Sequence, residues 1–402
     1  MKESRAIDSP DDATTSSRPP QAGQRSQEPA APLLDARFRK RFAAPAQEFV
    51  LEVEFQAAPG FTILFGPSGA GKTTLLDCVA GLAQPDSGRI VIGDRTLFDA
   101  AQNGDRPAVN LPVAKRRVGY VFQSLALFPH LTVEQNVQYG LAPLPPPERA
   151  AQASAILQAF RISHLAQRYP REISGGESQR TALARTLVTD PAALLLDEPL
   201  AALDASTKSK IIDDLRQWNQ AHRIPILYVT HSREEVFALG ERVIVLETGR
   251  IVAQGTPHEV ITAPLQETVA QLVGFENIFD ATVESVHPER GTMSCLISGD
   301  GGPVLLETPL VRGGVGEALR VGIRAGDILL ATAAPVGLSA RNIIPGRITS
   351  IEQRDVIVVA RVNCRIEMEV HLTLAARDSL QLAPGREVWL VIKTHSCHLM
   401  QK

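Results

Sequence analysis

The sequence predicts an α/β domain over residues 32–265, followed by an all-β part built of small barrel-like units. Three observations lead to this prediction. An apolar strand at residues 61–65 runs into a glycine-rich loop and then into a helix at 74–80. A second apolar strand, at 193–197, has the continuous hydrophobic character of a buried parallel strand. Beyond about residue 276, short β-rich stretches alternate with turns, as small all-β modules require.

Four parts make up the expected domain organisation. Residues 1–31 are mostly Ser, Thr, Pro, Gln and charged residues, which predicts a disordered tail; a wrongly chosen start codon would explain them equally well. The α/β domain covers 32–265, with a helical subdomain at about 124–180. Residues 266–338 are expected to form a linker and a first β unit, and residues 339–402 a second unit.

Composition restricts the classes of function. The 41 Lys and Arg residues against 44 Asp and Glu residues give a formal charge of −3, which argues against a general nucleic-acid binder. No apolar run approaches the ~18–20 residues that cross a bilayer, so any membrane role must come through a partner protein. The four cysteines form no C-x-x-C pair, which favours reduced thiols in a cytosolic protein.

Residues 66–74 match the phosphate loop G-x-x-x-x-G-K-[ST], and they lie between a strand and a helix as that motif requires. Glycines let the backbone wrap around phosphates, and the helix N-terminus adds the positive end of its dipole. Lys72 is expected to reach the β- and γ-phosphates, and the Thr73 hydroxyl to hold Mg²⁺. A nucleoside triphosphate should therefore bind Gly66, Pro67, Ser68, Gly69, Ala70, Gly71, Lys72, Thr73 and Thr74.

Two carboxylates end the strand at 193–197, at the edge where an open α/β sheet places its ligands. Asp197 is predicted to lie next to Mg²⁺ and to orient a metal-bound water. Glu198 is predicted to poise the attacking water as general base, an effect typically worth about 10²–10⁴ in rate. A strand that ends in acids is common by itself, but downstream of a phosphate loop it indicates a catalytic site.

Four further segments carry polar residues or glycines: one follows a β-rich run, one opens a helix, one comes directly after Glu198 and Pro199, and one is a strand that ends in a histidine. One has Ser and two Gly at a helix start, which forms a second anion site without a lysine. A lone Gln or His is structural more often than not, and here the order and spacing decide. The residues are Gln123, Ser174, Gly175, Gly176, Glu177, Asp204 and His231.

This constellation resembles the ATP-binding subunits of ABC transporters, over residues from about 33 to 265. The resemblance implies ATP and Mg²⁺ as cofactors, and a homodimer whose two nucleotide domains sandwich two ATP molecules. It further implies that the signature residues Ser174, Gly175 and Gly176 of one subunit cap the γ-phosphate held by the other, so that a monomer is nearly inactive. The signature begins with Ile173 where Leu is usual and carries Glu177 where Gln is commoner; neither change removes an anion-binding backbone group.

Further roles follow from the same resemblance. Gln123 would link Mg²⁺ and the attacking water to the membrane subunit. His231 would be the switch residue that contacts the γ-phosphate, and Asp204 the loop acid across the dimer interface. For stacking on adenine the family uses an aromatic residue upstream of the phosphate loop, and Phe42 lies at about the right distance, with Phe38 as the alternative.

An apolar stretch at residues 125–133 follows Gln123 and leads into a helix. An exposed apolar groove of this kind suggests a docking surface for the membrane partner. The alternative is that these residues fill the core of the small helical subdomain.

The C-terminal part contains a weak internal repeat. Residues 281–286 resemble residues 346–351, and residues 316–325 parallel residues 385–394. Two copies of an OB-like unit follow from this repeat. Units of about 65 residues bury little core and gain from pairing.

Residues 339–342, followed by Gly346 and later by Lys393, resemble the small molybdate-binding modules called mop domains, which are TOBE-like. In those modules a serine, backbone amides and a lysine region surround a tetrahedral oxyanion at subunit interfaces, where N–H and hydroxyl donors offset its desolvation. The alternative is a barrel that has kept the fold and lost the anion. The expected molybdate site comprises Ser339, Ala340, Arg341, Asn342, Lys393 and Thr394.

Together, these features resemble the ATP-binding subunits of molybdate importers, the ModC type. The resemblance implies a homodimer at the cytoplasmic face of the bacterial inner membrane, docked on a permease dimer and served indirectly by an extracytoplasmic molybdate-binding protein. The C-terminal part would then be a regulatory oxyanion module, and no nucleic-acid partner is expected.

Three alternatives to this reading remain. The first is an importer ATPase for sulfate, ferric iron or a sugar, which only the residues of the expected molybdate site argue against. The second is a soluble ABC ATPase that acts on nucleic acid or ribosomes, which usually carries two cassettes, whereas this chain has a single phosphate loop. The third is a molybdate storage or sensor module, against which the intact Lys72 and Glu198 argue.

Overall fold

The computed structural model describes residues 34–42, 49–101, 107–201, 203–262, 264, 266–299, 301–311 and 313–400. The tail predicted at residues 1–31 lies outside the described residues. Within the described part of the chain, no helix is both long enough and apolar enough to cross a membrane.

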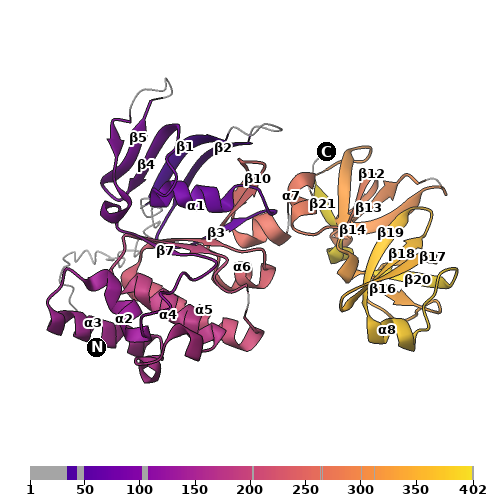
Figure 1. The fold of residues 1–402 in the computed structure, drawn as a ribbon. Coiled ribbons are helices and arrows are strands. Elements are labelled where there is room, and N and C mark those ends of the chain that lie inside the picture. Colours follow the sequence, from indigo (N-terminus) through magenta and orange to yellow (C-terminus); the bar gives the residue numbers. More distant parts are fainter. Residues whose placement is uncertain are drawn as a thin grey trace, which may run out of the picture. The chain divides into compact units, whose positions relative to one another are not determined.

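An 11-stranded sheet forms the scaffold of the N-terminal part (Figure 1), with strand order β6-β5-β4-β1-β2-β11-β10-β3-β9-β8-β7. Its last five strands, from β10 to β7, run parallel to one another. All residues of β3, β8 and β9 are buried, which fits their largely apolar sequences. The strands are β1 (Leu34–Phe42), β2 (Phe49–Ala57), β3 (Gly60–Phe65), β4 (Ser87–Ile92), β5 (Arg95–Ala100), β6 (Val109–Asn110), β7 (Val118–Val121), β8 (Ala193–Asp197), β9 (Pro225–Val229), β10 (Arg242–Glu247) and β11 (Arg250–Gly255).

Helices cover both faces of the parallel strands (Figure 1). Helix α1 buries Leu75, Leu76 and Val79 in one hydrophobic cluster, between the strands of the β1–β2 hairpin and β8, β9 and β10. Helices α2 to α7 contribute to a second cluster with the other side chains of β3, β8, β9 and β10. Their bounds are α1 (Lys72–Ala80), α2 (Val133–Gln138), α3 (Pro146–Ala159), α4 (Gly175–Leu187), α5 (Ala205–His222), α6 (Arg233–Leu239) and α7 (Glu267–Leu272).

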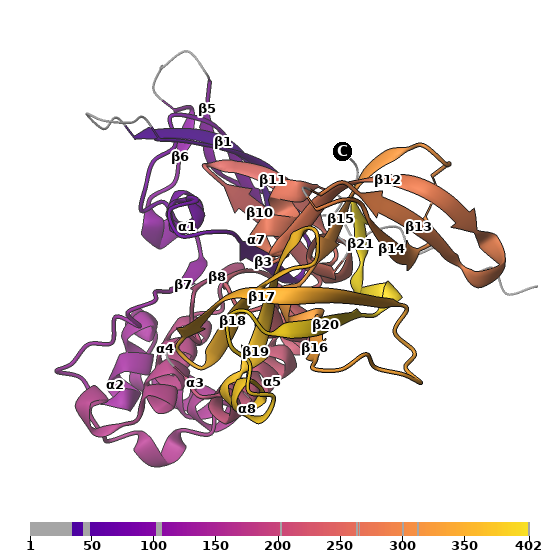
Figure 2. The same cartoon turned by 90° about the vertical axis from the view of Figure 1, so that its right-hand side faces the viewer.

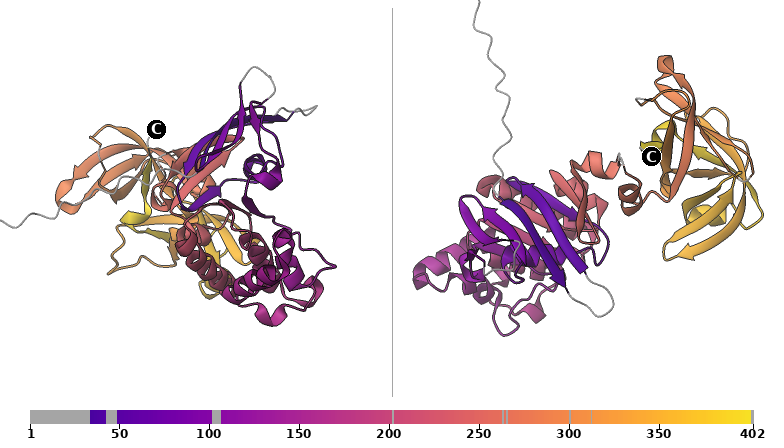
Figure 3. Two further views of the ribbon diagram at one scale, coloured as in Figure 1. Left: turned by 90° about the vertical axis from the view of Figure 1, so that its left-hand side faces the viewer. Right: turned by 90° about the horizontal axis from the view of Figure 1, so that it is seen from above.

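Two antiparallel five-stranded sheets form the C-terminal part, drawn in orange and yellow in Figure 3. They share one hydrophobic cluster, to which both contribute inward-facing side chains. The strands are β12 (Asn277–His287), β13 (Thr292–Ile297), β14 (Val304–Pro309), β15 (Ala318–Ile323), β16 (Leu329–Ala331), β17 (Asn342–Arg354), β18 (Ile357–Asn363), β19 (Glu367–Thr373), β20 (Glu387–Ile392) and β21 (His398–Met400), with a short helix α8 (Leu374–Ser379).

The two C-terminal units exchange their last strands (Figure 2). Strand β16 of the first unit pairs with β20 of the second, and β21 of the second unit pairs with β15 of the first. A fragment that begins at residue 339 would therefore lack one strand of its own sheet and leave β21 without its partner. The division of the chain at 338/339 stays a prediction about sequence units, and strand pairing crosses it in both directions.

Two buried asparagines fasten the units to each other in a symmetric way. Asn342 Oδ1 accepts a hydrogen bond from the Glu307 backbone N–H (2.7 Å), and its Nδ2 donates to the Glu307 carbonyl (2.9 Å). Asn277, at the same position in the first unit, makes the same pair of bonds to the backbone of Glu369, at 2.7 and 2.8 Å. The predicted repeat is thus present as two similar units, each of which binds the backbone of the other through one asparagine side chain.

Candidate active site

The loop between β3 and α1 has a backbone that only glycine allows at its two ends. Gly66 has φ 149°, and a Cβ there would lie 2.1 Å from the Leu246 carbonyl oxygen. Gly71 has φ 103° and is the residue that precedes the first turn of α1. A side chain at either position would deform the loop, because positive φ is costly for residues other than glycine.

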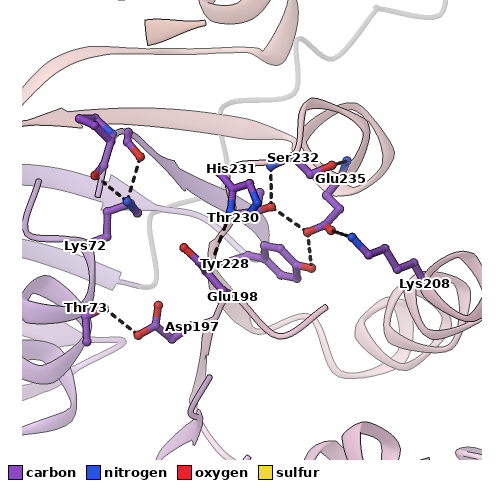
Figure 4. Close-up of polar contacts among 12 residues, drawn as sticks. Lys72, Thr73, Asp197, Glu198, Lys208, Tyr228, Thr230, His231, Ser232 and Glu235 are labelled. Atoms are coloured by element: carbon purple, nitrogen blue, oxygen red, sulfur yellow. Dashed lines mark hydrogen bonds and ion pairs between the residues drawn. The ribbon is translucent and has the colours of Figure 1, made fainter. Parts of the chain in front are cut away.

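Lys72 folds back across this loop (Figure 4). Its Nζ donates to the backbone oxygens of Gly66 (2.8 Å) and Pro67 (2.9 Å). Burial lowers the pKa of the Lys72 ammonium, and the charges of Glu198 and Asp197 oppose that shift. The ammonium is therefore held at the mouth of the loop, where a phosphate can replace the two carbonyl contacts.

Thr73 and Asp197 meet on the opposite side of the same site. The Thr73 hydroxyl donates to Asp197 Oδ2 at 2.8 Å, although 124 residues separate the two. Burial raises the pKa of Asp197, while the Thr73 bond lowers it. A hydroxyl and a carboxylate together are hard oxygen donors of the type that Mg²⁺ prefers, so this pair fits that ion.

Glu198 turns away from the line of β8. Its φ of 45° lies in the left-handed region, which is uncommon for a residue with a side chain. One carboxylate oxygen, Oε2, lies 3.6 Å from Nδ1 of His231, at the end of the neighbouring strand β9 (Figure 4). The structure thus brings the predicted general base and the predicted switch histidine together.

A cavity of about 470 Å³ lies over the loop and brings most of the predicted nucleotide-site residues together. Phe42 lines it and is 41% exposed, whereas Phe38 is 2% exposed and belongs to the core. Phe42 is thus the candidate that adenine can reach, and Phe49 lies beside it, with a ring centroid 6.3 Å away. The lining residues are Phe42, Phe49, Ser68, Gly69, Gly71, Lys72, Thr73, Thr74, Gln123, Asp197 and Glu198.

The signature and Asp204 do not line this cavity. Ser174 is exposed at the start of α4, where its hydroxyl accepts a bond from the Glu177 backbone N–H and its own N–H donates to Glu177 Oε2 (2.7 Å). The Ser174 hydroxyl also donates to Glu177 Oε2 (2.9 Å), and the two bonds that this carboxylate accepts from Ser174 lower the pKa of Glu177. Asp204 precedes α5 and accepts a bond from the Thr207 N–H at 3.0 Å. Both helix starts present their groups to the surface of the chain.

The loop that follows Gln123 is fixed from two sides. The buried Asn136 accepts a bond from the Phe128 N–H and donates to backbone oxygens, among them that of Phe128. The guanidinium of Arg185 donates to the carbonyls of Leu125 (2.8 Å) and Ala126 (2.7 Å), two residues with positive φ. These contacts hold the apolar segment predicted as a docking surface in one conformation.

Of the predicted molybdate residues, Ser339, Arg341 and Lys393 are exposed and Thr394 is half-buried. Arg341 Nε lies 3.8 Å from Glu307 Oε1. Ala340 and Asn342 are buried, and the Asn342 side chain is committed to the backbone of Glu307.

The chain matches the family model described as ABC transporter over residues 51–201, and the TOBE domain model over residues 338–399. It is 38% identical to the molybdenum import ATP-binding protein ModC of Rhizobium meliloti (strain 1021), over 86% of this chain and 95% of that protein. The chain belongs to the ModC family of ABC-type ATP-binding proteins. The predicted family, fold class and ATPase activity are thereby confirmed.

Two further matches complete the comparison. The molybdate/tungstate import ATP-binding protein WtpC of Pyrococcus abyssi (strain GE5 / Orsay) is 38% identical, over 83% of this chain and 90% of that protein. Among solved structures, the dimeric structure of MJ0796, a bacterial ABC transporter cassette, is 27% identical over 56% of this chain and 99% of that one, with a TM-score of 0.49.

In this member of the ModC family, three residues far from the phosphate loop in the chain support the site without having been predicted from the sequence. Phe49 faces Phe42 because the β1–β2 hairpin pairs these two positions, which alternation in the two strands could have indicated. Asn136 and Arg185 carried no such signal. In the sequence, an asparagine or an arginine in a helix does not indicate that it binds the backbone of the loop after Gln123.

Proposed function

We propose that this protein hydrolyses ATP to power the import of molybdate through a membrane permease. The observation that carries the proposal is the match to ModC proteins along almost the whole chain, including the C-terminal units. In this proposal two copies lie at the cytoplasmic face of the bacterial inner membrane and dock on a permease dimer. An extracytoplasmic molybdate-binding protein delivers the substrate. A sulfate, ferric-iron or sugar importer is the alternative.

Hydrolysis is assigned to residues around the cavity. Lys72 holds the β- and γ-phosphates, and Phe42 stacks on adenine. Thr73 and Asp197, with Gln123, hold Mg²⁺, which supplies positive charge against the phosphate oxygens. Glu198 accepts the proton of the attacking water, and His231, 3.6 Å from it, contacts the γ-phosphate.

The site is completed by a second copy of the chain. Within one chain the cavity lacks the signature, because Ser174 and Gly175 are exposed at the start of α4 and do not line it. Free N–H groups at a helix start bind anions, so the signature of one copy can cap the γ-phosphate held by the other. Asp204 would then lie across the same interface.

The permease is proposed to dock on residues 125–133. This segment follows Gln123 directly, and Asn136 and Arg185 fix its backbone. A movement of the permease that displaces this segment would therefore also displace Gln123, because the backbone between them is held in one conformation.

One oxyanion is proposed to bind each chain, at the second C-terminal unit. In the first unit, the Glu276 carboxylate accepts a bond from the backbone N–H of Ala325 (2.9 Å). The matching positions in the second unit are Arg341, directly before β17, and Thr394, two residues after β20. A carboxylate thus fills the first position, whereas Arg341, Ser339 and Lys393 leave cationic and hydroxyl groups for an oxyanion at the second.

Reconstitution tests the import function. Proteoliposomes that contain this protein, its permease and the binding protein should accumulate labelled molybdate only with internal ATP, and an excess of sulfate should not compete. Uptake of sulfate in preference to molybdate would support the alternative importer.

The oxyanion site has a separate test. Equilibrium dialysis of the full-length protein should give one molybdate per chain, lost in Lys393→Ala and kept in Lys210→Ala, an exposed lysine of α5. No binding in the wild type would remove the oxyanion site and leave the import function standing.

A further inference from the structure

A buried ionic cluster lies directly behind His231 (Figure 4). Its centre is Glu235, in the first turn of α6, whose side chain is only 5% exposed. Glu235 Oε2 accepts hydrogen bonds from the hydroxyls of Tyr228 (2.9 Å) and Thr230 (2.8 Å), and Oε1 pairs with Lys208 Nζ at 3.2 Å. A carboxylate is costly to bury unless it is paired, and here the contacts that compensate it come from β9, from the residue that follows β9 and from α5.

The cluster fixes the backbone on both sides of His231. Thr230, the preceding residue, donates its hydroxyl to Glu235 and accepts a bond from the N–H of Ser232 (3.0 Å). Ser232, the following residue, accepts a bond from the Glu235 N–H through its hydroxyl (3.3 Å). The imidazole itself is 69% exposed, so packing does not hold it. Its place beside Glu198 therefore depends on the loop that Glu235 holds.

Lys208 extends the cluster to the start of α5. It lies in the first turn of that helix, where its N–H donates to the Asp204 carbonyl (2.9 Å). The neighbouring Thr207 packs against the signature: a Cβ added to Gly176 would lie 2.6 Å from Thr207 Cγ2. The start of α5 thus contacts the signature on one side and Glu235 on the other.

We propose that Glu235 is a positioning residue that holds the His231 loop in place for hydrolysis. Its ion pair with Lys208 ties that loop to the start of α5, which backs the signature of the same chain. Since the signature serves the other ATP of the proposed dimer, this contact joins the two composite sites. The inference rests on the proposed role of His231 and not on the transported substrate.

The test measures steady-state ATP hydrolysis by the full-length protein. Glu235→Gln keeps the shape of the side chain and removes its charge. It should lower kcat about 10-fold with KM for ATP within about twofold, because the phosphate loop is untouched. Glu234→Gln, an exposed neighbour on α6, is the matched control and should leave kcat unchanged.

A double-mutant cycle separates positioning from a purely structural role. If Glu235 acts through His231, then Glu235→Gln should change kcat by less than about twofold in a His231→Ala background. Equal losses of kcat in both backgrounds would overturn the proposal. A His231→Ala variant with normal kcat would instead refute the role of His231 itself.

The Lys208 link has its own cycle. Lys208→Met should lower kcat, and Lys208→Met combined with Glu235→Gln should be no slower than Glu235→Gln alone, since each removes the same ion pair. If the double variant instead shows a loss of kcat equal to the product of the two single losses, the proposed link between Lys208 and Glu235 is wrong. If Glu235→Gln fails to fold, Tyr228→Phe can replace it, because this variant removes one hydrogen bond to the Glu235 carboxylate. Its loss of kcat should likewise disappear in a His231→Ala background. An equal loss of kcat with and without His231 would count against the proposal.

Discussion

Asp197 and Glu198 are adjacent in the chain, but their surroundings prepare them for different tasks. Asp197 is buried at the end of β8 and accepts the Thr73 hydroxyl, which suits a metal ligand. Glu198 has positive φ, a conformation that costs about 1–3 kcal/mol and turns its carboxylate towards His231. Backbone conformation, rather than residue type, therefore separates the two proposed roles.

The role of Glu198 can be tested by removing its charge. Glu198→Gln should keep ATP binding and lower hydrolysis about 100-fold or more, because only the proton acceptor is lost, and an ATP-bound dimer should accumulate. Phosphate release and nucleotide binding, measured with the permease present, check this prediction. Lys72→Ala is the contrasting variant and should weaken ATP binding instead. Equal hydrolysis in wild type and Glu198→Gln would contradict the assignment.

Asp197 should lower the stability of the nucleotide-free protein. Burial raises its pKa above the ordinary value of 3.8, so the folded protein binds this proton more tightly than the unfolded chain does. The ionised carboxylate therefore opposes folding above the pKa of the folded state, and the effect disappears as the pH falls below 3.8.

Asp197→Asn should accordingly raise the melting temperature at about pH 7 by a few degrees, with a gain that shrinks towards about pH 4. Thermal unfolding of both proteins at a series of pH values measures this. The exposed Asp94→Asn is the control and should show no such trend. A variant that melts below the wild type at neutral pH would contradict the prediction.

The starts of α4 and α5 show how two helices can serve a site that their own chain does not complete. Each begins at a residue whose side chain caps the first turn, Ser174 for α4 and Asp204 for α5. The caps hold the first turns in place, and both starts lie outside the chain's own cavity. This arrangement fits the proposal that the signature acts on a phosphate that another copy presents.

Complementation tests this arrangement. Ser174→Arg and Lys72→Ala should each be nearly inactive as homodimers, whereas a mixture should recover activity, because half of the heterodimer's sites combine an intact signature with an intact phosphate loop. ATP hydrolysis at a series of mixing ratios measures the recovery. If no ratio exceeds the activity of the separate variants, the pairing in trans is wrong.

The C-terminal part as a whole behaves as one body made of two units. Exchange of β16 and β21 and the two asparagine side chains give each unit strands and hydrogen bonds from the other. The proposed oxyanion at Lys393 and Thr394 would lie next to this shared structure, since both residues follow β20, in the segment that leads to β21. An anion bound there can consequently affect the conformation of both units.

Molybdate is therefore expected to regulate the ATPase. If the anion favours a spacing of two subunits that keeps Ser174 from the opposite phosphate, hydrolysis should slow as molybdate rises. Closure of the two nucleotide domains should in turn weaken molybdate binding by the same factor by which molybdate weakens closure. The corresponding coupling free energy is typically ~1–3 kcal/mol. Lys393→Ala should relieve the inhibition without lowering the uninhibited rate, and sulfate should inhibit less. A flat response of the reconstituted transporter up to millimolar molybdate would leave the C-terminal units as a dimerisation device.

The sequence by itself determined the fold class, the family and the residues of the phosphate loop, because each of these depends on contiguous motifs with a fixed local geometry. A glycine-rich loop between a strand and a helix can adopt few conformations, and an apolar strand that ends in acids has one natural place in a parallel sheet.

Only the tertiary structure decided what those motifs contact. It placed Phe42 in the cavity and Phe38 in the core, left the signature outside its own cavity, and committed the Asn342 side chain to the backbone of Glu307. It also exchanged β16 and β21 and assembled the cluster around Glu235. These features are pairings between residues far apart in the chain, and edge strands or buried polar residues carry no local mark of which partner they will meet.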